Sequence, residues 1–245
     1  KVVDIVTEPM KLARMKPERG SFRAEAEYQL RYVGLDAACL DKYPSELSGG
    51  QRQRVAIARA VAMEPELLIA DEPIASLDVS IQAQIVNLFR HLQRSHGFSI
   101  LFIAHDLAMV EFLCDRVGVM YHGQLVEVAP CKELYQNPLH PYTKALLLSQ
   151  PQLGVRGHDL HSIKGSPPNL YKEIKGDAFA PRNPDAMKID YEYEPPFFKA
   201  SETHYAKTWL LCDKAEEYCS ELAQASAKCA ENAEVPPKDF SNAKP

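Results

Sequence analysis

The sequence has no apolar stretch long enough to cross a membrane. Its longest apolar blocks are Leu67–Ala70 and Ile100–Ala104. They are far shorter than the roughly 20 residues that a membrane-spanning helix needs, and they have the length of buried strands. The chain also lacks an excess of positive charge, because its 245 residues carry a net charge of −5. A dedicated nucleic-acid-binding protein is usually basic on at least one face, so the composition disfavours that class.

Cysteines are few and scattered. The chain has 6 cysteines, none of them in a CxxC pair, and no secretory signal is visible. Reduced thiols in a cytosolic protein are therefore the expected state. Cys212, Cys219 and Cys229 lie close together in the sequence, but their spacing fits no zinc-binding pattern and leaves their role open.

What the chain does contain is an alternation of helical and extended patterns, which predicts an α/β fold. Beyond Pro151 prolines cluster, and we expect only one further helix, near Ala206–Ala230, before a loose tail. The expected helices are Val2–Met10, Phe22–Val33, Gln51–Met63, Ser80–Ser95 and Leu107–Cys114; the expected strands are Glu66–Ala70 and Phe98–Ala104; and a β-hairpin pairs Val117–Tyr121 with Gln124–Val128 across His122-Gly123.

The most informative segment is Leu47-Ser48-Gly49-Gly50-Gln51, which leads directly into an alanine-rich helix. Ser48 supplies a hydroxyl, and the two glycines leave backbone N–H groups open to close approach. The positive end of the following helix adds to this, so the segment is suited to binding an anion, most simply a phosphate. The alternative is an ordinary helix cap made of serine and glycine.

Two acids follow the first buried strand. Asp71 and Glu72 stand at the C-terminal end of Leu67–Ala70, which in open parallel sheets is the edge where ligands bind. One carboxylate there can hold Mg²⁺, and the adjacent one can polarise a water molecule. The alternative is a solvated acidic turn at the end of a buried strand.

Two further polar residues are placed by the same pattern. His105 follows the second strand, so we expect it near Asp71 and Glu72, where an imidazole can hydrogen-bond a phosphate oxygen and orient an attacking water. Asp78 precedes the helix that starts at Ser80, and capping that helix is one role open to it.

Together these segments resemble ABC ATPases over at least residues 40–130. Leu47–Gln51 resembles the signature motif, and Leu67–Asp71 followed by Glu72 resembles the Walker B motif with its catalytic glutamate. Ser76-Leu77-Asp78 is similar to the D-loop, although Ile74-Ala75 replaces the commoner Thr/Val-Ser. His105 resembles the switch histidine. The resemblance implies part of a P-loop NTPase core with a helical subdomain.

The resemblance also assigns roles to the residues. Asp71 is expected to hold Mg²⁺, Glu72 to act as general base, and His105 to contact the γ-phosphate. Asp78 is expected at the interface between two ATPase subunits, a role compatible with a helix cap. The signature residues are expected to contact the ATP of a partner subunit: Ser48, Gly49, Gly50 and Gln51. The implied cofactors are ATP and Mg²⁺.

One element of the family pattern is missing. Phosphoryl transfer by this fold uses GxxxxGK[ST], whose amides and lysine hold the β- and γ-phosphates, and the chain contains no Gly-Lys pair. We therefore expect a C-terminal fragment that begins after the Q-loop, and we expect this polypeptide alone to be inactive and to bind ATP poorly.

Downstream segments resemble the C-terminal extension of oligopeptide and dipeptide importer ATPases. The most distinctive is His140-Pro141-Tyr142-Thr143, a turn leading into an amphipathic helix, and the others are Gly165–Pro168, Gly176–Pro184, Glu194–Phe198 and Thr203–Tyr205. Many relatives carry four cysteines here in patterns suited to an iron–sulfur cluster. The matching positions are Asp177, Asn183, Asp190 and Thr208. None is a thiolate ligand, so no cluster is expected.

The resemblance thus implies the ATP-binding subunit, in fragment form, of a bacterial ABC importer that couples ATP hydrolysis to oligopeptide or dipeptide uptake. The expected partners are a second ABC ATPase in a heterodimer, membrane permeases and, indirectly, a peptide-binding protein, with no nucleic acid. The expected location is the cytoplasmic face of the cell membrane. The expected domains are residues 1–63 (helical subdomain), 64–130 (C-terminal half of the ATPase core), 131–212 (importer-type extension) and 213–245 (helix and loose tail).

Two other functions are less consistent with the sequence. A soluble ABC ATPase of translation or DNA repair normally carries tandem cassettes or long coiled-coil insertions, and neither is found in this sequence. A non-catalytic interaction protein with a degenerate cassette predicts loss of Glu72 or His105, and both are present.

Overall fold

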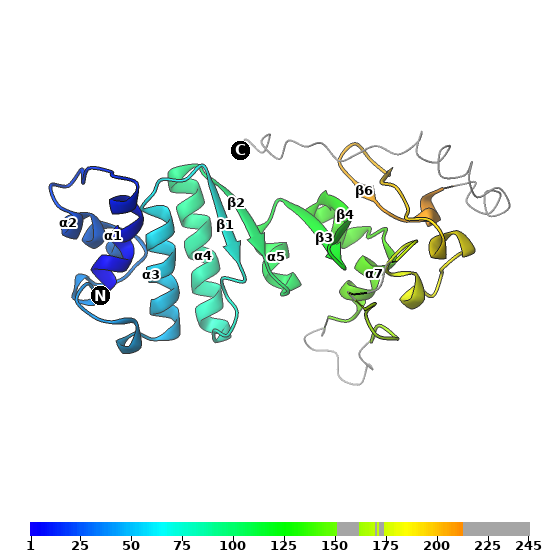
Figure 1. Ribbon diagram of the computed structural model, residues 1–245, viewed down its shortest axis with the longest axis horizontal. Coiled ribbons are helices and arrows are strands. Elements are labelled where there is room, and N and C mark those ends of the chain that lie inside the picture. Colours follow the sequence, from blue (N-terminus) through cyan, green and yellow to red (C-terminus); the bar gives the residue numbers. More distant parts are fainter. Residues whose placement is uncertain (151–161, 170, 172–173, 213–245) are drawn as a thin grey trace. The chain divides into compact units, whose positions relative to one another are not determined.

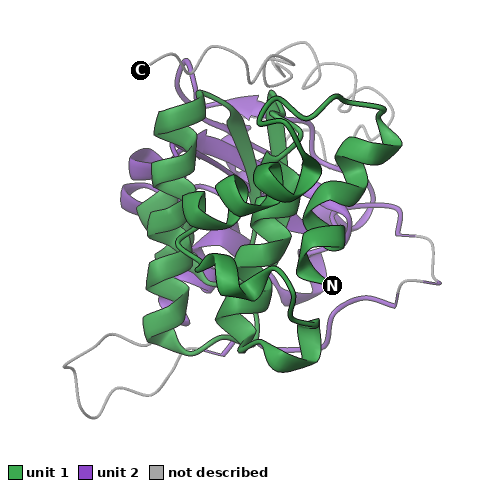
Figure 2. Cartoon of the chain, turned by 90° about the vertical axis from the view of Figure 1, so that its left-hand side faces the viewer, with its two compact units in different colours: residues 1–113 green, residues 114–245 purple. Residues whose placement is uncertain are grey.

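The chain divides into two compact units, Lys1–Leu113 and Cys114–Pro245, which Figure 2 shows in different colours. A computed structural model describes residues 1–150, 162–169, 171 and 174–212 (Figure 1). Helices and sheets occur in both units, so the predicted α/β class is confirmed. The predicted domain limits after residues 63, 130 and 212 stay predictions.

The first unit opens with three mutually packed helices, α1 (Val2–Leu12), α2 (Phe22–Tyr32) and α3 (Gly49–Val61). Each is amphipathic and turns its apolar side inward: Val6, Leu30 and Val55 are all buried in one core. Between α2 and α3 lie two short 3-10 helices, Ala37–Cys39 and Pro44–Glu46.

The rest of this unit is a two-stranded parallel sheet with its crossover helix. Strand β1 (Leu67–Asp71) pairs with β2 (Ser99–Ile103), and α4 (Val79–His96) connects them; α5 (Leu107–Leu113) follows. Side chains alternate along the strands, and one face packs on α4, where Phe102 meets Phe89 edge to face. The opposite face is exposed and apolar: Leu67, Ile69, Leu101 and Ile103.

The second unit is built on the predicted hairpin. Strands β3 (Arg116–Tyr121) and β4 (Gln124–Pro130) pair antiparallel. His122 and Gly123 form the two-residue turn, both with positive φ, as hairpin turns of this length require. Two short strands, β5 (Phe198–Lys199) and β6 (Tyr205–Ala206), complete a sheet of order β3-β4-β6-β5. The helices here are α6 (Cys131–Gln136), α7 (Pro141–Leu148) and the 3-10 helices Ala180–Arg182, Lys188–Tyr191 and Trp209–Leu211.

Two expectations need correction. The helix of the signature segment begins at Gly49, two residues before the predicted start at Gln51, because the Ser48 side chain caps it. The helix expected near Ala206–Ala230 is wrong at its start: Tyr205–Ala206 is strand β6, and Trp209–Leu211 is a single 3-10 turn. Residues 213–230 lie outside the described part of the chain.

Candidate active site

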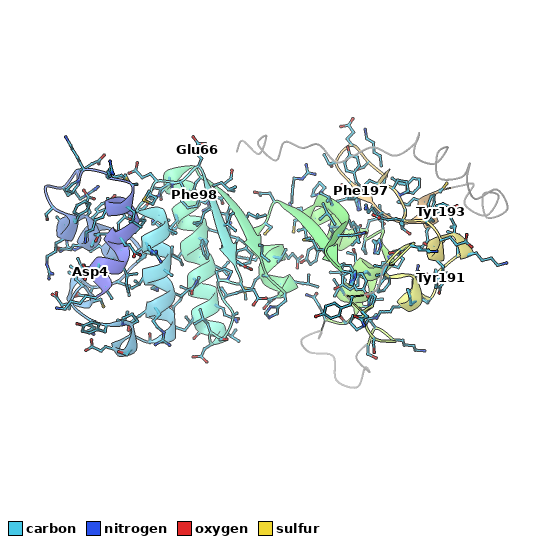
Figure 3. The ribbon with its side chains drawn as sticks, viewed as in Figure 1. Asp4, Glu66, Phe98, Tyr191, Tyr193 and Phe197 are labelled. Atoms are coloured by element: carbon cyan, nitrogen blue, oxygen red, sulfur yellow. The ribbon has the colours of Figure 1, made fainter. Side chains whose placement is uncertain are left out.

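Asp71, Glu72 and His105 meet at the C-terminal ends of β1 and β2. The strands run parallel with Asp71 opposite Ile103, and the Glu72 N–H donates to the Ile103 carbonyl at 2.9 Å. His105 follows two residues later, and its Nδ1 lies 3.6 Å from Oε1 of Glu72. Glu66 and Phe98, labelled in Figure 3, lie at the opposite, N-terminal end of the two strands. The predicted meeting of these three residues is thus found at the edge where ligands bind in parallel sheets.

These three side chains are open to solvent. The His105 side chain is 77% exposed and that of Glu72 is 56% exposed. Asp71 lies on the outward face of β1, and within the described residues its carboxylate has no hydrogen-bonding or ionic partner. A free carboxylate at a strand end fits Mg²⁺, which is usually held by one or two carboxylates together with substrate phosphates.

The backbone after β1 is held in an unusual conformation. Glu72 has φ +44° and Ser76 has φ +62°, in the left-handed region that non-glycine residues rarely adopt. The turn is kept in place by hydrogen bonds from the Ala75 N–H to the Glu72 carbonyl and from Gln82 Nε2 to the Ile74 carbonyl. Such strain is typical of functional sites, where the surrounding structure holds a side chain in one required position.

The signature segment is a capped helix start. The Ser48 hydroxyl accepts a hydrogen bond from the Gln51 N–H at 3.3 Å, and the Gln51 side chain accepts one from the Ser48 N–H at 3.0 Å. The helix-cap alternative is therefore correct for Ser48. The N–H groups of Gly49 and Gly50 have no acceptor among the described residues, so α3 still presents an open, electropositive N-terminus to an anion.

Two arginines of α3, to which the sequence motifs assign no role, hold this helix in place. Arg52 donates to the Leu47 carbonyl at 2.6 Å, in the segment that precedes the signature. Arg54 donates to the Val33 carbonyl at the end of α2, at 2.6 Å, and to the Gln84 side chain on α4, at 3.2 Å. The only sequence signal for this anchoring of α3 is the position of the two arginines shortly after a pair of glycines.

Asp78 occupies the N-cap position of α4, as expected, but its side chain makes no capping hydrogen bond. Its carbonyl accepts the N–H groups of Ile81 and Gln82. The side chain is exposed, which is compatible with the subunit-interface role that stays a prediction.

The His140-Pro141-Tyr142-Thr143 segment is part of a buried polar network in the second unit. His140 caps α7, its Nδ1 accepting from the Tyr142 N–H at 3.0 Å. The N–H groups of Leu139 and His140 donate to the Glu127 carboxylate on β4. His204 Nε2 is 2.7 Å from the same carboxylate, while its Nδ1 is 3.2 Å from Glu133 on α6. Glu127, the centre of this network, has as its only sequence signal an acid between two valines of an apolar strand.

Burial and hydrogen bonding set the charges in this network. Burial alone would raise the pKa of Glu127, but the His204 ring and the backbone N–H donors lower it. Burial would lower the pKa of His204, but its hydrogen bonds and its attraction to Glu127 and Glu133 raise it. His140 receives no comparable support, and burial lowers its pKa to about 4. The network therefore pairs a charged His204 with Glu127 beside a neutral His140.

The four positions that the resemblance matched to cluster cysteines form local hydrogen bonds in this chain. Each side-chain oxygen accepts a nearby backbone N–H: Asp177 from Phe179, Asn183 from Asp185, Asp190 from Met187 and Thr208 from Leu210. Among the described residues, no group of three or more His, Cys, Asp or Glu side chains is arranged to hold a metal ion. Cys219 and Cys229 lie outside that part of the chain.

The chain is similar to known proteins of the ABC transporter family. Residues 5–75 match the ABC transporter family, and residues 126–189 match the C-terminal region of oligopeptide/dipeptide transporters. The oligopeptide transport ATP-binding protein AmiE of Streptococcus pneumoniae is 51% identical over 175 residues, which are 71% of this chain and 49% of that protein. OppD of Bacillus subtilis, an oligopeptide transport ATP-binding protein, is 48% identical over 213 residues, 86% of this chain and 60% of that protein. OppF of the same bacterium is 56% identical over 153 residues, 61% of this chain and 49% of that protein.

The fold, with two acids at the end of a parallel strand and a capped, glycine-rich helix start, is that of the ABC class of proteins. The chain belongs to the ABC transporter family, and within it to the group with the oligopeptide/dipeptide transporter C-terminal region. It spans roughly half to three fifths of the length of the curated relatives described above. Within the described residues, no helix combines the length and the apolarity needed to cross a membrane.

Proposed function

We propose that the chain acts in an ATP-binding subunit of an ABC importer for oligopeptides or dipeptides, in which ATP hydrolysis drives uptake. The observation that carries this proposal is the placement of His105 3.6 Å from Glu72 at the adjoining ends of two parallel strands. The similarity to oligopeptide transport ATP-binding proteins supports the choice of substrate.

In this proposal Glu72 is the general base for the subunit's own nucleotide. Its exposed carboxylate accepts the proton of the attacking water, and the neighbouring imidazole of His105 orients that water and contacts the γ-phosphate. Asp71 contributes a carboxylate oxygen to Mg²⁺, which neutralises phosphate charge when bound. The fixed backbone turn at Glu72 keeps the base in position, so little reorganisation accompanies proton transfer.

The signature segment serves a different nucleotide. The N–H groups of Gly49 and Gly50, which have no acceptor among the described residues, lie at the positive N-terminal end of α3, and they suit the phosphates of an ATP held by a partner ATPase. Ser48 keeps its own hydroxyl proton for donation, because in its capping bond it is the acceptor. Gln51 completes this set, and Asp78 lies at the interface between the two subunits.

A groove on the three-helix part of the first unit supports contact with permeases. It has a volume of about 450 Å³, and Val2, Ile5, Leu47 and Val55 are among its mostly apolar lining residues. An apolar groove between helices suits a short amphipathic helix of a partner. The proposal thus includes permeases as partners, a second ABC ATPase paired with this one, and a location at the cytoplasmic face of the membrane.

The test is a Glu72→Gln substitution introduced into the chromosomal gene that encodes the chain. The measurement is the uptake of a labelled peptide by the cells. Removal of a general base costs about 10²–10⁴-fold in rate, so uptake should fall to background. Glu66→Gln is the matched control, because Glu66 is an exposed acid at the other end of the same strand. Normal peptide uptake with Glu72→Gln would refute the proposal.

A further inference from the structure

The two glycines of the signature lie against α4 and the turn that precedes it. A Cβ atom built on Gly50 would come within 2.7 Å of Ile81 Cγ2, and one on Gly49 within 3.3 Å of Leu77 Cδ2. A carbon–carbon distance of 2.7 Å is far inside van der Waals contact. The missing side chains of these glycines therefore make room for Ile81 and Leu77.

Ile81 is well placed to fix the start of α3. It lies in the first turn of α4, and its N–H donates to the Asp78 carbonyl. Leu77 is in the turn that carries the strained Glu72 and Ser76, and Gln82, beside Ile81, donates to the Ile74 carbonyl of the same turn. One short segment, residues 72–82, thus connects Glu72 at the strand end with the residues that pack against the N-terminus of α3.

We propose that Ile81 is a positioning residue for the signature. Its branched side chain occupies the space in which a Cβ atom of Gly50 would lie, and it sets where the open N–H groups of α3 meet a partner's ATP. The inference rests on the proposed function, and it changes the explanation of Gly50: glycine is required there by Ile81, on the side facing its own chain, rather than by the approach of a nucleotide. A gap in this packing leaves α3 folded but lets its N-terminus shift.

The contact is tested by a double-mutant cycle in the 245-residue chain. Gly50→Ala should lower the urea midpoint of unfolding because its methyl group meets Ile81. Adding Ile81→Ala should raise the midpoint again, because the new methyl group fills the space that is vacated. Additive effects of the two substitutions would show that the contact does not exist.

The positioning role is tested in the transporter assembled in its own membrane, from the KM for ATP and the kcat of hydrolysis. Ile81→Ala should raise the KM by about tenfold with kcat within about twofold, as expected for weakened binding with unchanged chemistry. Ile81→Val keeps the branch at Cβ and should restore the KM, as should Gly50→Ala combined with Ile81→Ala. Val79→Ala, in the same helical turn but 76% exposed, is the control and should leave both constants unchanged.

The outcomes separate the two proposals. If Ile81→Ala lowers the urea midpoint but leaves the KM unchanged, Ile81 is merely structural and the positioning role is overturned. If the wild-type assembly hydrolyses no ATP, the proposed function fails and the role in ATP binding fails with it, while the unfolding cycle still reports on the contact itself.

Discussion

His140 shows how one buried side chain can make the stability of a unit depend on pH. Its Nδ1 accepts a hydrogen bond from the Tyr142 N–H, so the ring proton of the neutral form sits on Nε2, which is buried without a partner in the described structure. The ring is fully buried, and Lys144 opposes a second proton while Glu127 favours it. Burial is the larger effect, and it holds the pKa of His140 at about 4.

We predict that His140→Asn removes an acid-induced loss of stability. Below pH 6.5 the unfolded chain protonates His140 while the folded chain does not, so this residue costs stability as the pH falls from 6.5 to its folded pKa of about 4. Between pH 7 and pH 4 the wild type should lose about 3 kcal/mol relative to the variant. Asparagine retains an oxygen that can cap the Tyr142 N–H. The measurement is urea unfolding followed by the fluorescence of Trp209, the chain's single tryptophan, which is buried in the same unit.

Asp177 provides the opposing control. Burial raises its pKa to about 6, so the folded chain holds a proton that the unfolded chain has lost. This residue therefore adds stability as the pH falls from 6 toward the unfolded value near 3.8. Relative to Asp177→Asn, the wild type should gain about 2 kcal/mol over that range. If both variants and the wild type gave parallel profiles of stability against pH, the lowered pKa of His140 and the raised pKa of Asp177 would both be contradicted.

At the scale of elements, one carboxylate connects several helices and strands of the second unit. The Glu127 carboxylate on β4 accepts hydrogen bonds from two N–H groups in the residues that lead into α7. It also pairs with the ring of His204, which lies just before β6, and the other nitrogen of that ring is bonded to Glu133 on α6. Aromatic side chains reinforce the same junction: Tyr142 packs on Tyr121 of β3 and on Phe179, with ring centroids 4.6 and 5.4 Å apart. The importer-type segments at residues 140–143, 176–184 and 203–205 thus share one core.

We predict that Glu127→Gln lowers the free energy of unfolding by about 3 kcal/mol, because it leaves the buried, charged His204 without its main partner. The matched control is Glu133→Gln. Glu133 bonds the other nitrogen of His204 but is 32% exposed, and its loss should cost about 1 kcal/mol or less. Both values come from urea titrations at pH 7. Equal losses for the two variants would mean that burial does not decide the strength of these pairs.

At the scale of the whole molecule, the chain combines a strand-end base with a signature helix but contains no Gly-Lys pair in its 245 residues. The sequence therefore holds only some of the elements that the family uses to bind and hydrolyse a nucleotide. Asp71, Glu72 and His105 are the residues proposed to act on phosphate and water, but the sequence contains no GxxxxGK[ST] loop to hold the β- and γ-phosphates.

We predict that the purified 245-residue chain releases no phosphate from ATP above the rate of the buffer and binds ATP only weakly. Phosphate release and calorimetric titration with Mg²⁺ and ATP are the measurements. Turnover that disappears in the Glu72→Gln variant would contradict this prediction, because it would show that the chain holds a nucleotide in a productive position without that loop.

The sequence by itself determined the features that depend on neighbouring residues. Asp71 and Glu72 end a strand because they follow four apolar residues, and His105 reaches the same edge because the C-terminal ends of parallel strands meet. The hairpin turn at His122-Gly123 and the helix after Ser48 also follow from local chemistry.

Only the tertiary structure decided contacts between residues far apart in the chain. His204 pairs with Glu127 across 77 positions, and no local pattern predicts which buried acid accepts a given imidazole. Strands β5 and β6 are two residues long, too short to show a period of two. The signature glycines show both levels. Their flexibility and open N–H groups can be read from the sequence, whereas the packing of Ile81 against Gly50 depends on how α4 crosses α3.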